Sequence, residues 1–454
     1  MGRTVRMRAS GLTGEPVAKG HSRSDQGFPL AAIFASSLVV VWALLSGCAS
    51  RDNIDPRPEL LSSGWLDAPA VAPVADFDTY VAEVKQELRA HRLPFAPSMA
   101  DAELKSVAPF SIPPGSGCLP GVPRGIAVLV HGLSDTAFAM RDLASSFSRL
   151  CFEARVLLLP GHGTRPADLM VVDHRDWLAH VDAAVAQANR ENDRVVLAGF
   201  SLGAVLALAV AAESPDKVDA VIGLSPAYRL RSDTLARQAR WVAAFRPWLD
   251  LGPREDFARY GAMPTKGIAS TMAALSLMDG RVRRKGALKT PWLVVQSEDD
   301  EVIDVASNRS FFDARASDPR SVFINYFSEP PQEVFSQTFS QRVIWLPAAH
   351  DALRVVGLSH RALHISPDNP HYGITGSYRN CGSTPFRKEQ EIRACKEASQ
   401  VWYGVGGQSP PPGEAGARAT FNPHYPDLER RIGEFLSQVD GRSHKSVASQ
   451  LPGP

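Results

Sequence analysis

The chain has 454 residues, of which 44% are hydrophobic, and this apolar fraction excludes a globally disordered or a collagen-like protein. Its 49 Lys and Arg residues are balanced by 48 Asp and Glu residues, so the formal net charge of +1 gives no long-range field for nucleic acid. The length allows up to three domains, or one large α/β domain with insertions. The five cysteines are an odd number, which requires an explanation.

The N-terminal segment has the parts of an export signal. A basic stretch, residues 1–27, precedes an apolar run over residues 28–45, and Leu-Ser-Gly at the end of the run leads directly into Cys48. This ending resembles the lipobox of bacterial lipoproteins, and the resemblance implies that Cys48 is lipidated and begins the mature chain. The alternative is a single transmembrane helix, because the 18-residue run is just long enough to span a bilayer. Pro29 and the lack of a positive cluster after the run favour the lipoprotein.

The lipoprotein resemblance implies a signal peptide over residues 1–47 and a membrane tether over residues 48–75. Met7 is an alternative start, because the basic stretch is long. Cleavage would remove five basic and two acidic residues. The mature chain would then have 44 basic and 46 acidic residues. Several acyl chains hold a protein firmly on a membrane, so we expect a lipid-anchored protein of the bacterial cell envelope. Ala49 and Ser50 lack the Asp of a signal for inner-membrane retention, which favours the outer membrane, facing the periplasm or the surface, in an organism with two membranes.

Export also explains the cysteine count. Cys118, Cys151, Cys381 and Cys395 remain besides the anchor, and an even number in an oxidising compartment favours two disulfides. Three pairings are possible, and proximity in the sequence favours Cys118–Cys151 and Cys381–Cys395. The alternative is four free, buried thiols.

The mature chain alternates strand and helix signals. Continuous apolar runs predict buried strands, and amphipathic or Ala-rich stretches predict helices. Strands are expected at residues 126–130, 155–159, 194–198, 218–224, 292–295 and 353–356. Helices are expected at residues 76–92, 176–188, 202–212 and 427–439. This alternation favours the α/β class, with a doubly wound, mostly parallel sheet that is covered on both faces.

One globular domain over residues 76–454 accounts for these signals, with two insertions. The first insertion, residues 226–290, has helical patterns and many Trp, Phe and Met residues. The second insertion, residues 366–425, is loop-rich.

The segment from Gly199 to Gly203 places Ser201 in a Gly-x-Ser-x-Gly pattern between a predicted strand and a predicted helix. This is the context of a nucleophile elbow, in which a strained turn lifts the serine Oγ above the sheet. The glycines are required because side chains at their positions would clash with neighbouring backbone. The backbone N–H of Leu202 lies at the start of the following helix, where an anionic oxygen is favoured.

Two further loops strengthen the pattern. His131-Gly132 ends the strand at residues 126–130, and the segment resembles the oxyanion loop of α/β-hydrolases, in which the next residue, here Leu133, supplies the second N–H donor. Pro160-Gly161-His162-Gly163 resembles a loop of monoacylglycerol-lipase-like enzymes. We interpret His131 and His162 as structural residues. Together with the elbow, these loops resemble the lipase-like and lysophospholipase-like serine hydrolases of that superfamily over about residues 120–365.

The remaining members of a triad should follow the serine in the order acid and then histidine. Asp300 has the spacing to the following apolar pair that the family shows, whereas Asp299, Asp304 and Glu298 are weaker candidates. His360 follows an apolar run and precedes Leu363, as the family's histidine does. His350, which follows a possible strand at residues 343–347, and His364 are the alternatives.

The resemblance implies a serine carboxylic-ester hydrolase that works through an acyl-enzyme on acyl-glycerol or lysophospholipid-like esters. The 226–290 insertion takes the place of the family's cap, and its apolar residues either form an acyl pocket or only pack the cap. An acyltransferase or thioesterase with the same triad is an alternative, as is a catalytically silent lipoprotein that binds lipids or envelope partners. The histidines lack metal-ligand spacing, so we expect no metal and no cofactor. The sequence does not indicate an oligomeric state.

Overall fold

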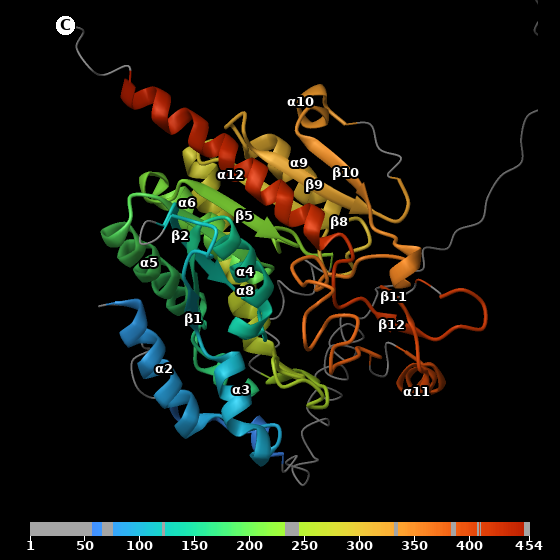
Figure 1. Ribbon diagram of the computed structural model, residues 1–454. Coiled ribbons are helices and arrows are strands. Elements are labelled where there is room, and N and C mark those ends of the chain that lie inside the picture. The colour runs from blue at the N-terminus through green and yellow to red at the C-terminus, as the bar shows by residue number, and fades with distance from the viewer. Residues whose placement is uncertain are drawn as a thin grey trace, which may run out of the picture. The chain divides into compact units, whose positions relative to one another are not determined.

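The computed structural model describes residues 57–65, 76–119, 123–231, 245–330, 335–382, 387–405, 408 and 410–448 (Figure 1). They belong to one unit of the chain, Arg57–Pro454. The predicted signal peptide and its lipidation site Cys48 lie outside the described residues. None of the described helices is both long and apolar enough to cross a membrane.

The centre of the domain is an eight-stranded sheet of order β1-β3-β2-β4-β5-β8-β9-β10. Strand β1 is antiparallel to β3, and the other strands run parallel to their neighbours. The strands of this sheet are β1 Phe110–Ile112, β2 Gly125–Val130, β3 Phe152–Val156, β4 Val195–Phe200, β5 Ala220–Leu224, β8 Trp292–Ser297, β9 Val322–Phe327 and β10 Val343–Pro347. The predicted α/β fold with a mostly parallel sheet is confirmed.

Helices cover both faces of the sheet (Figure 1). Val128 and Leu197 belong to the apolar cluster on the face of α5, α6 and α8, whereas their chain neighbours Leu129 and Ala198 belong to the cluster on the face of α4 and α12. Side chains alternate between faces along a strand, so strands that are apolar throughout feed two cores. The helices are α2 Phe77–His91, α3 Ala100–Val107, α4 Arg141–Arg149, α5 His174–Glu191, α6 Leu202–Glu213, α8 Thr265–Lys285, α9 Val305–Arg315, α10 Gln337–Ser340, α11 Glu389–Glu397 and α12 Tyr425–Ala448.

The local sequence explains where several helices begin. The Asp76 side chain accepts a hydrogen bond from the Thr79 N–H at the start of α2, and Asp173 and Asp176 form a capping box at the start of α5. Helix α6 has buried residues on all sides because it lies between the sheet and two other helices, α5 and α8.

Two predicted strands differ from the structure. The strand expected at residues 155–159 is β3, which lies earlier in the chain and ends at Val156. Residues 353–356 form no strand; Asp351–Leu353 is a single 3-10 turn, and Val355 makes only isolated bridges to His350 and Tyr403. The sheet is completed instead by β9 and β10, which pair in parallel register. Val355 is buried, and the Val356 N–H donates to the Tyr403 carbonyl of the second insertion, so a short run with a buried residue need not be a strand.

Only part of the first insertion lies where a cap is expected. Its second half is α8, which packs along α6 and serves as the crossover helix between β5 and β8. Met272, Leu275 and Met278 on this helix are buried, and the last two belong to the core of the domain. The remaining described part carries a two-stranded sheet, β6 Trp248–Leu251 with β7 Ala262–Pro264. We call residues 245–264 the cap loop.

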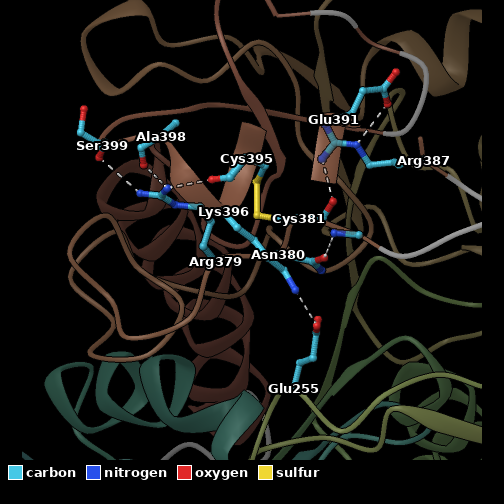
Figure 2. The surroundings of a disulfide bond; sticks show 11 residues. Glu255, Arg379, Asn380, Cys381, Arg387, Glu391, Cys395, Lys396, Ala398 and Ser399 are labelled. Carbon is cyan, nitrogen blue, oxygen red and sulfur yellow. Dashed lines mark hydrogen bonds and ion pairs between the residues drawn. A yellow bond between two sulfur atoms is a disulfide. The ribbon is translucent and has the colours of Figure 1, made fainter. Parts of the chain in front are cut away.

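The second insertion contains α11 and a small parallel sheet, β11 Trp402–Gly404 with β12 Gly416–Arg418. The disulfide Cys381–Cys395 fastens α11 to the start of the insertion, and Arg379 donates to the carbonyl oxygens of Cys395 and Ala398 (Figure 2). The other disulfide, Cys118–Cys151, joins the chain before β2 to the start of β3. Both predicted pairings are confirmed.

Part of the predicted tether packs against the domain. Pro58–Leu60 forms a short 3-10 helix, and Trp65 is buried in the core. The Ser62 hydroxyl and the Ser63 N–H both donate to the Asp168 carboxylate. The chain is therefore held on the domain surface from Arg57 to Trp65.

Candidate active site

Ser201 occupies a sharp turn between β4 and α6. Its backbone has φ 52° and ψ −113°, a conformation that side-chain-bearing residues adopt only under strain. A Cβ atom on Gly199 would lie 2.2 Å from the Gly203 carbonyl carbon, and one on Gly203 would lie 2.1 Å from the Val130 carbonyl oxygen. Only glycine fits at either position, as the elbow interpretation requires.

Three side chains from distant parts of the chain form a continuous hydrogen-bonded series. The Ser201 Oγ lies 2.9 Å from the His360 Nε2, and the His360 Nδ1 lies 2.7 Å from the Asp300 Oδ2. The buried carboxylate accepts from Nδ1, which leaves the neutral ring's Nε2 free to accept the serine proton. Of the sequence candidates, the structure therefore brings Asp300 and His360 to the serine.

Backbone hydrogen bonds orient the acid. The Asp300 Oδ1 accepts from the N–H groups of Val302 and Ile303 at 2.8 Å and 3.1 Å. The apolar pair that singled out Asp300 in the sequence thus also supplies the turn that holds its carboxylate.

The alternative acids point elsewhere. Asp299 accepts from the Leu358 N–H at 3.2 Å and from Ser328, and burial raises the pKa of its carboxyl. Asp304 caps α9 through the Ser307 N–H, and Glu298 pairs with Arg309. These three carboxylates have structural contacts of their own.

The alternative histidines also have other contacts. His350 caps the 3-10 turn that follows it through the Leu353 N–H. His364 stacks on Phe200 with the ring centroids 4.0 Å apart. Burial, with repulsion from Arg361 and His360, holds the pKa of His364 well below its ordinary value.

The two residues predicted to supply oxyanion donors lie in segments that pack against each other. Leu202 is the first residue of α6, where the helix offers its N–H no acceptor, and Leu133 lies in the loop directly after β2. Gly203 approaches the carbonyl oxygens of Val130 and His131 so closely that no side chain fits between them. The elbow therefore packs on the end of β2, beside the loop that carries Leu133.

His131 and His162 hold this loop, as their structural interpretation predicts. The Nε2 of His131 accepts from the Leu159 N–H at 3.1 Å, and the Nε2 of His162 accepts from the Ser134 N–H at 3.1 Å. Each ring is neutral with its proton on Nδ1, which donates to a backbone carbonyl. Burial lowers the pKa of His131 to about 4 and that of His162 to about 3.

Sequence reasoning missed a set of charged residues near the histidine. Arg361 pairs with Asp135 at 3.0 Å, next to the oxyanion loop. Asp256 of the cap loop accepts from the Tyr372 hydroxyl at 2.7 Å and lies 3.0 Å from the His371 Nε2. These contacts join the cap loop and the second insertion around the triad. Nothing in the local pattern identifies them; only the positions of Asp135 and Arg361 beside motif residues offer a hint.

The chain is similar to a known enzyme family and to two monoacylglycerol lipases. Residues 121–326 match the family described as Serine aminopeptidase, S33. The thermostable monoacylglycerol lipase of Bacillus sp. strain H-257 is 31% identical over 94 residues, 21% of this chain and 37% of that protein. The monoacylglycerol lipase of Mycolicibacterium smegmatis is 25% identical over 249 residues, 47% of this chain and 85% of that protein.

Solved structures of two further lipases are similar in part. A soluble variant of the monoglyceride lipase of Saccharomyces cerevisiae gives a TM-score of 0.42 at 16% identity and covers 48% of this chain and 82% of that one. The monoacylglycerol lipase of Paleococcus ferrophilus gives a TM-score of 0.40 at 19% identity and covers 48% of this chain and 88% of that one.

Proposed function

We propose that this chain, which belongs to the α/β-hydrolase superfamily of serine hydrolases, is a membrane-anchored esterase that cleaves acyl-glycerol or lysophospholipid-like esters through an acyl-enzyme. The observation that carries the proposal is the series from Ser201 through His360 to Asp300, with the serine on a strained elbow. The similarity to two monoacylglycerol lipases supports the choice of ester.

The chemistry follows from the protonation states. His360 Nε2 takes the Ser201 proton as Oγ attacks the acyl carbonyl, and the ring becomes an imidazolium held by the Asp300 carboxylate. The N–H groups of Leu133 and Leu202 stabilise the oxygen that becomes negative in the tetrahedral intermediate. The protonated His360 then gives its proton to the departing alcohol. Water then attacks the acyl-enzyme with His360 as base, and the carboxylic acid product leaves the enzyme.

A fluorophosphonate probe, which phosphonylates activated serines, tests this proposal. We expect the wild-type protein to be labelled and Ser201→Ala to remain unlabelled while keeping its melting temperature. Ser310→Ala is the matched control, because that serine is exposed on α9 and bonds only to the Ala306 carbonyl within its own helix. A folded wild-type protein that is not labelled would refute the proposal, and labelling of Ser201→Ala would show that another serine reacts.

An ester series from acetate to palmitate on one alcohol tests the lipid-like substrate. We expect kcat/KM to rise from acetate to longer chains, since an apolar acyl site gains about 0.8 kcal/mol for each buried methylene group. A strict preference for acetate would exclude acyl-glycerols and lysophospholipids but would leave the esterase proposal intact.

The membrane anchor is tested independently of the chemistry. Intact mass spectrometry of the mature protein should show a chain that begins at Cys48 and carries acyl groups. Cys48→Ser should release the protein from the membrane fraction with its ester hydrolysis preserved. A wild-type mass without acyl groups would contradict the lipoprotein resemblance.

A further inference from the structure

Arg259 of the cap loop lies against the predicted oxyanion loop, and its two neighbours fix its backbone there. The Ala258 carbonyl accepts from the Thr136 hydroxyl at 2.8 Å, and the Tyr260 N–H donates to the Ser134 carbonyl at 2.9 Å. All four of these residues are buried. The arginine stem therefore begins at a fixed point, directly beside the residue that follows Leu133.

The guanidinium of Arg259 uses little of its hydrogen-bonding capacity. A guanidinium has five N–H donors, and here the Nη2 donates to the Ser134 Oγ at 3.4 Å. Its Nε is buried with no acceptor, and no carboxylate among the described residues lies within ion-pair distance of this side chain. Burial, with repulsion from Arg361, lowers the pKa of Arg259. The Arg259 side chain is half-buried, and a partly desolvated cation with a buried, unpaired N–H is stabilised by an anionic partner.

The nearest carboxylates are already committed to other groups. Asp135 is paired with Arg361 at 3.0 Å. Asp256 accepts from the Tyr372 hydroxyl and from the Ala258 N–H at 2.9 Å, and it pairs with His371. Neither side chain can turn to Arg259 without leaving a buried partner unsatisfied.

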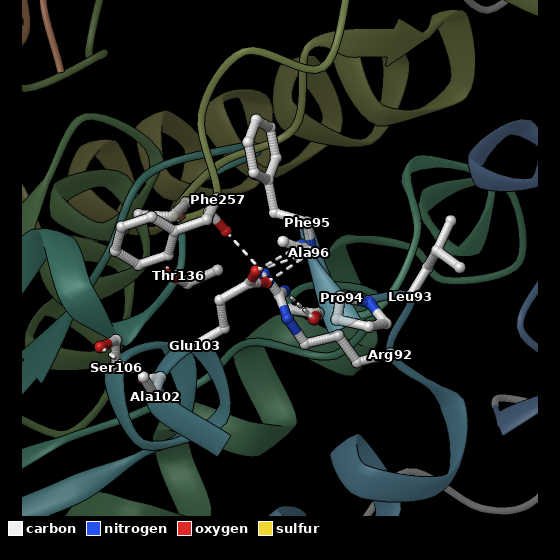
Figure 3. A network of polar contacts seen from close by, with 12 residues as sticks. Arg92, Leu93, Pro94, Phe95, Ala96, Ala102, Glu103, Ser106, Thr136 and Phe257 are labelled. Carbon is white, nitrogen blue, oxygen red and sulfur yellow. Dashed lines mark hydrogen bonds and ion pairs between the residues drawn. The ribbon is translucent and has the colours of Figure 1, made fainter. Parts of the chain in front are cut away.

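Arg259 also faces open space. It lines a hollow together with Arg92, Arg254, Thr136, Thr164 and Tyr260. Glu103, the buried carboxylate that pairs with Arg92 of this hollow, is saturated, because it also accepts from the N–H groups of Phe95 and Ala96 (Figure 3). Glu59 lies on the wall of the hollow as the opposing charge, and Arg254 is turned to the carbonyl oxygens of Leu93 and Pro94.

We propose that Arg259 binds an anionic group, a carboxylate or a phosphate, that the ester substrate carries close to its scissile bond. A planar guanidinium takes either anion through two parallel N–H···O bonds. The inference rests on the proposed esterase function and narrows its substrate to anionic esters. Such a group would satisfy the unpaired Nε of Arg259 and would position the carbonyl at the oxyanion loop.

Two pairs of esters test the proposal, and the members of each pair differ in the anionic group that one of them carries. For an anion on the acyl side, 4-nitrophenyl hexanoate is compared with the mono-4-nitrophenyl ester of adipic acid. For an anion on the alcohol side, 1-decanoylglycerol is compared with 1-decanoylglycerol 3-phosphate. We expect the wild-type kcat/KM to favour the anionic ester by about tenfold or more in at least one pair, as a desolvated charge pair allows.

Variants then connect the preference to Arg259. In Arg259→Gln the ratio of anionic to neutral kcat/KM should fall about tenfold or more. Arg259→Lys should keep part of the ratio, because it preserves the charge without the planar fork. Arg175→Gln makes the same chemical change at an exposed position on α5 and should keep the wild-type ratio.

The outcomes separate this inference from the esterase proposal. If the wild-type enzyme hydrolyses neutral and anionic esters equally in both pairs, Arg259 does not select an anion, although the esterase proposal stands. If Arg259→Gln lowers kcat/KM equally for the anionic and the neutral ester of a pair, the anion-binding inference is also overturned, because the arginine would then act on the fold or on the oxyanion. If Arg259→Gln does not fold, the inference is judged from the ratio of anionic to neutral kcat/KM in the wild type and in Arg259→Lys. If no ester is cleaved and no fluorophosphonate is bound, the esterase proposal itself has failed.

Discussion

The Asp300 carboxylate receives hydrogen bonds from two kinds of donor, and each has its own role. The His360 Nδ1 binds one oxygen, and the backbone of Val302 and Ile303 binds the other. Because the backbone fixes the plane of the carboxylate, the imidazole is oriented before substrate arrives. Replacing Asp300 by an amide of the same shape should therefore still disturb the imidazole, because the amide would be held in the same orientation.

Asp300→Asn should lower kcat by about 10⁴-fold at neutral pH. The amide NH₂ would face Nδ1 and favour the tautomer with its proton on Nε2, which cannot accept from Ser201. Steady-state hydrolysis of a nitrophenyl ester, with the thermal melt as a fold control, measures this effect.

Asp299→Asn is the matched control at the neighbouring position. Its carboxylate contacts Ser328 and the Leu358 N–H and does not touch the histidine. We expect kcat to remain within about tenfold of the wild type, since the geometry of the triad is preserved. A loss as large as that of Asp300→Asn would mean that the acid had been assigned wrongly.

The predictability of the site differs from residue to residue. Ser201, with the adjacent Leu202, follows from the pattern of its flanking glycines, and Asp300 follows from the turn that also binds it. Arg259 and Asp256 could not be predicted, because their positions depend on how the cap loop folds back over β2. An arginine or an aspartate in a loop has no local pattern that separates a site residue from a surface charge.

At the scale of elements, the two elbow glycines let the turn between β4 and α6 pack tightly against itself and against the end of β2. Gly203→Ala would place a Cβ atom 2.1 Å from the Val130 carbonyl oxygen, so the turn would have to open. We expect a loss of stability of about 3 kcal/mol or more, in the range of severe overpacking, together with loss of fluorophosphonate labelling. Chemical denaturation measures the first effect.

Gly280→Ala in α8 is the control for the same substitution in open space. A Cβ there would meet only the end of the Arg284 side chain at 3.7 Å. Because alanine is the better helix former, this variant should gain about 0.5–1 kcal/mol. A destabilised Gly280→Ala beside a stable Gly203→Ala would reverse our account of both sites.

The disulfide Cys381–Cys395 fastens a loop-rich element that has little core of its own. It closes a loop with a sequence separation of 14, for which the loss of chain entropy corresponds to about 3 kcal/mol. The double variant Cys381→Ser/Cys395→Ser should increase hydrogen exchange over residues 387–399 while Ser201 is still labelled. The buried contacts of Asp256 with His371 and Tyr372 should keep the insertion against the cap loop. Unchanged exchange would show that the disulfide is dispensable for local order.

The element predictions failed where hydrophobic runs had two explanations. Residues 353–356 and β10 are both short and apolar, and only pairing with β9 makes β10 a strand. Helix α8 reads as part of a cap by its position in the chain, yet it packs on α6. Short apolar runs show that a segment is buried but do not show against which partner.

At the scale of the whole molecule, the apolar core contains histidines that must stay neutral. Burial lowers the pKa of His131 and His180 to about 4 and that of His162 to about 3. In the unfolded chain these rings titrate near pH 6.5. Between about pH 6.5 and pH 4 the unfolded chain therefore binds more protons than the folded one, and stability falls as the pH falls.

The pH dependence of unfolding tests this consequence without any assumption about catalysis. From pH 7 to pH 5 each of the three rings should remove up to about 1.4 kcal/mol of unfolding free energy per pH unit once the pH is below 6.5. His180 allows its share to be isolated, because it lies on α5 with Tyr80 as its partner and takes no part in the triad. In His180→Gln the loss of unfolding free energy between pH 6.5 and pH 5 should be smaller than in the wild type by the contribution of one ring. Urea denaturation at fixed ionic strength measures this loss. If the two proteins lose stability in parallel, His180 is already charged in the folded core and the burial argument fails for it.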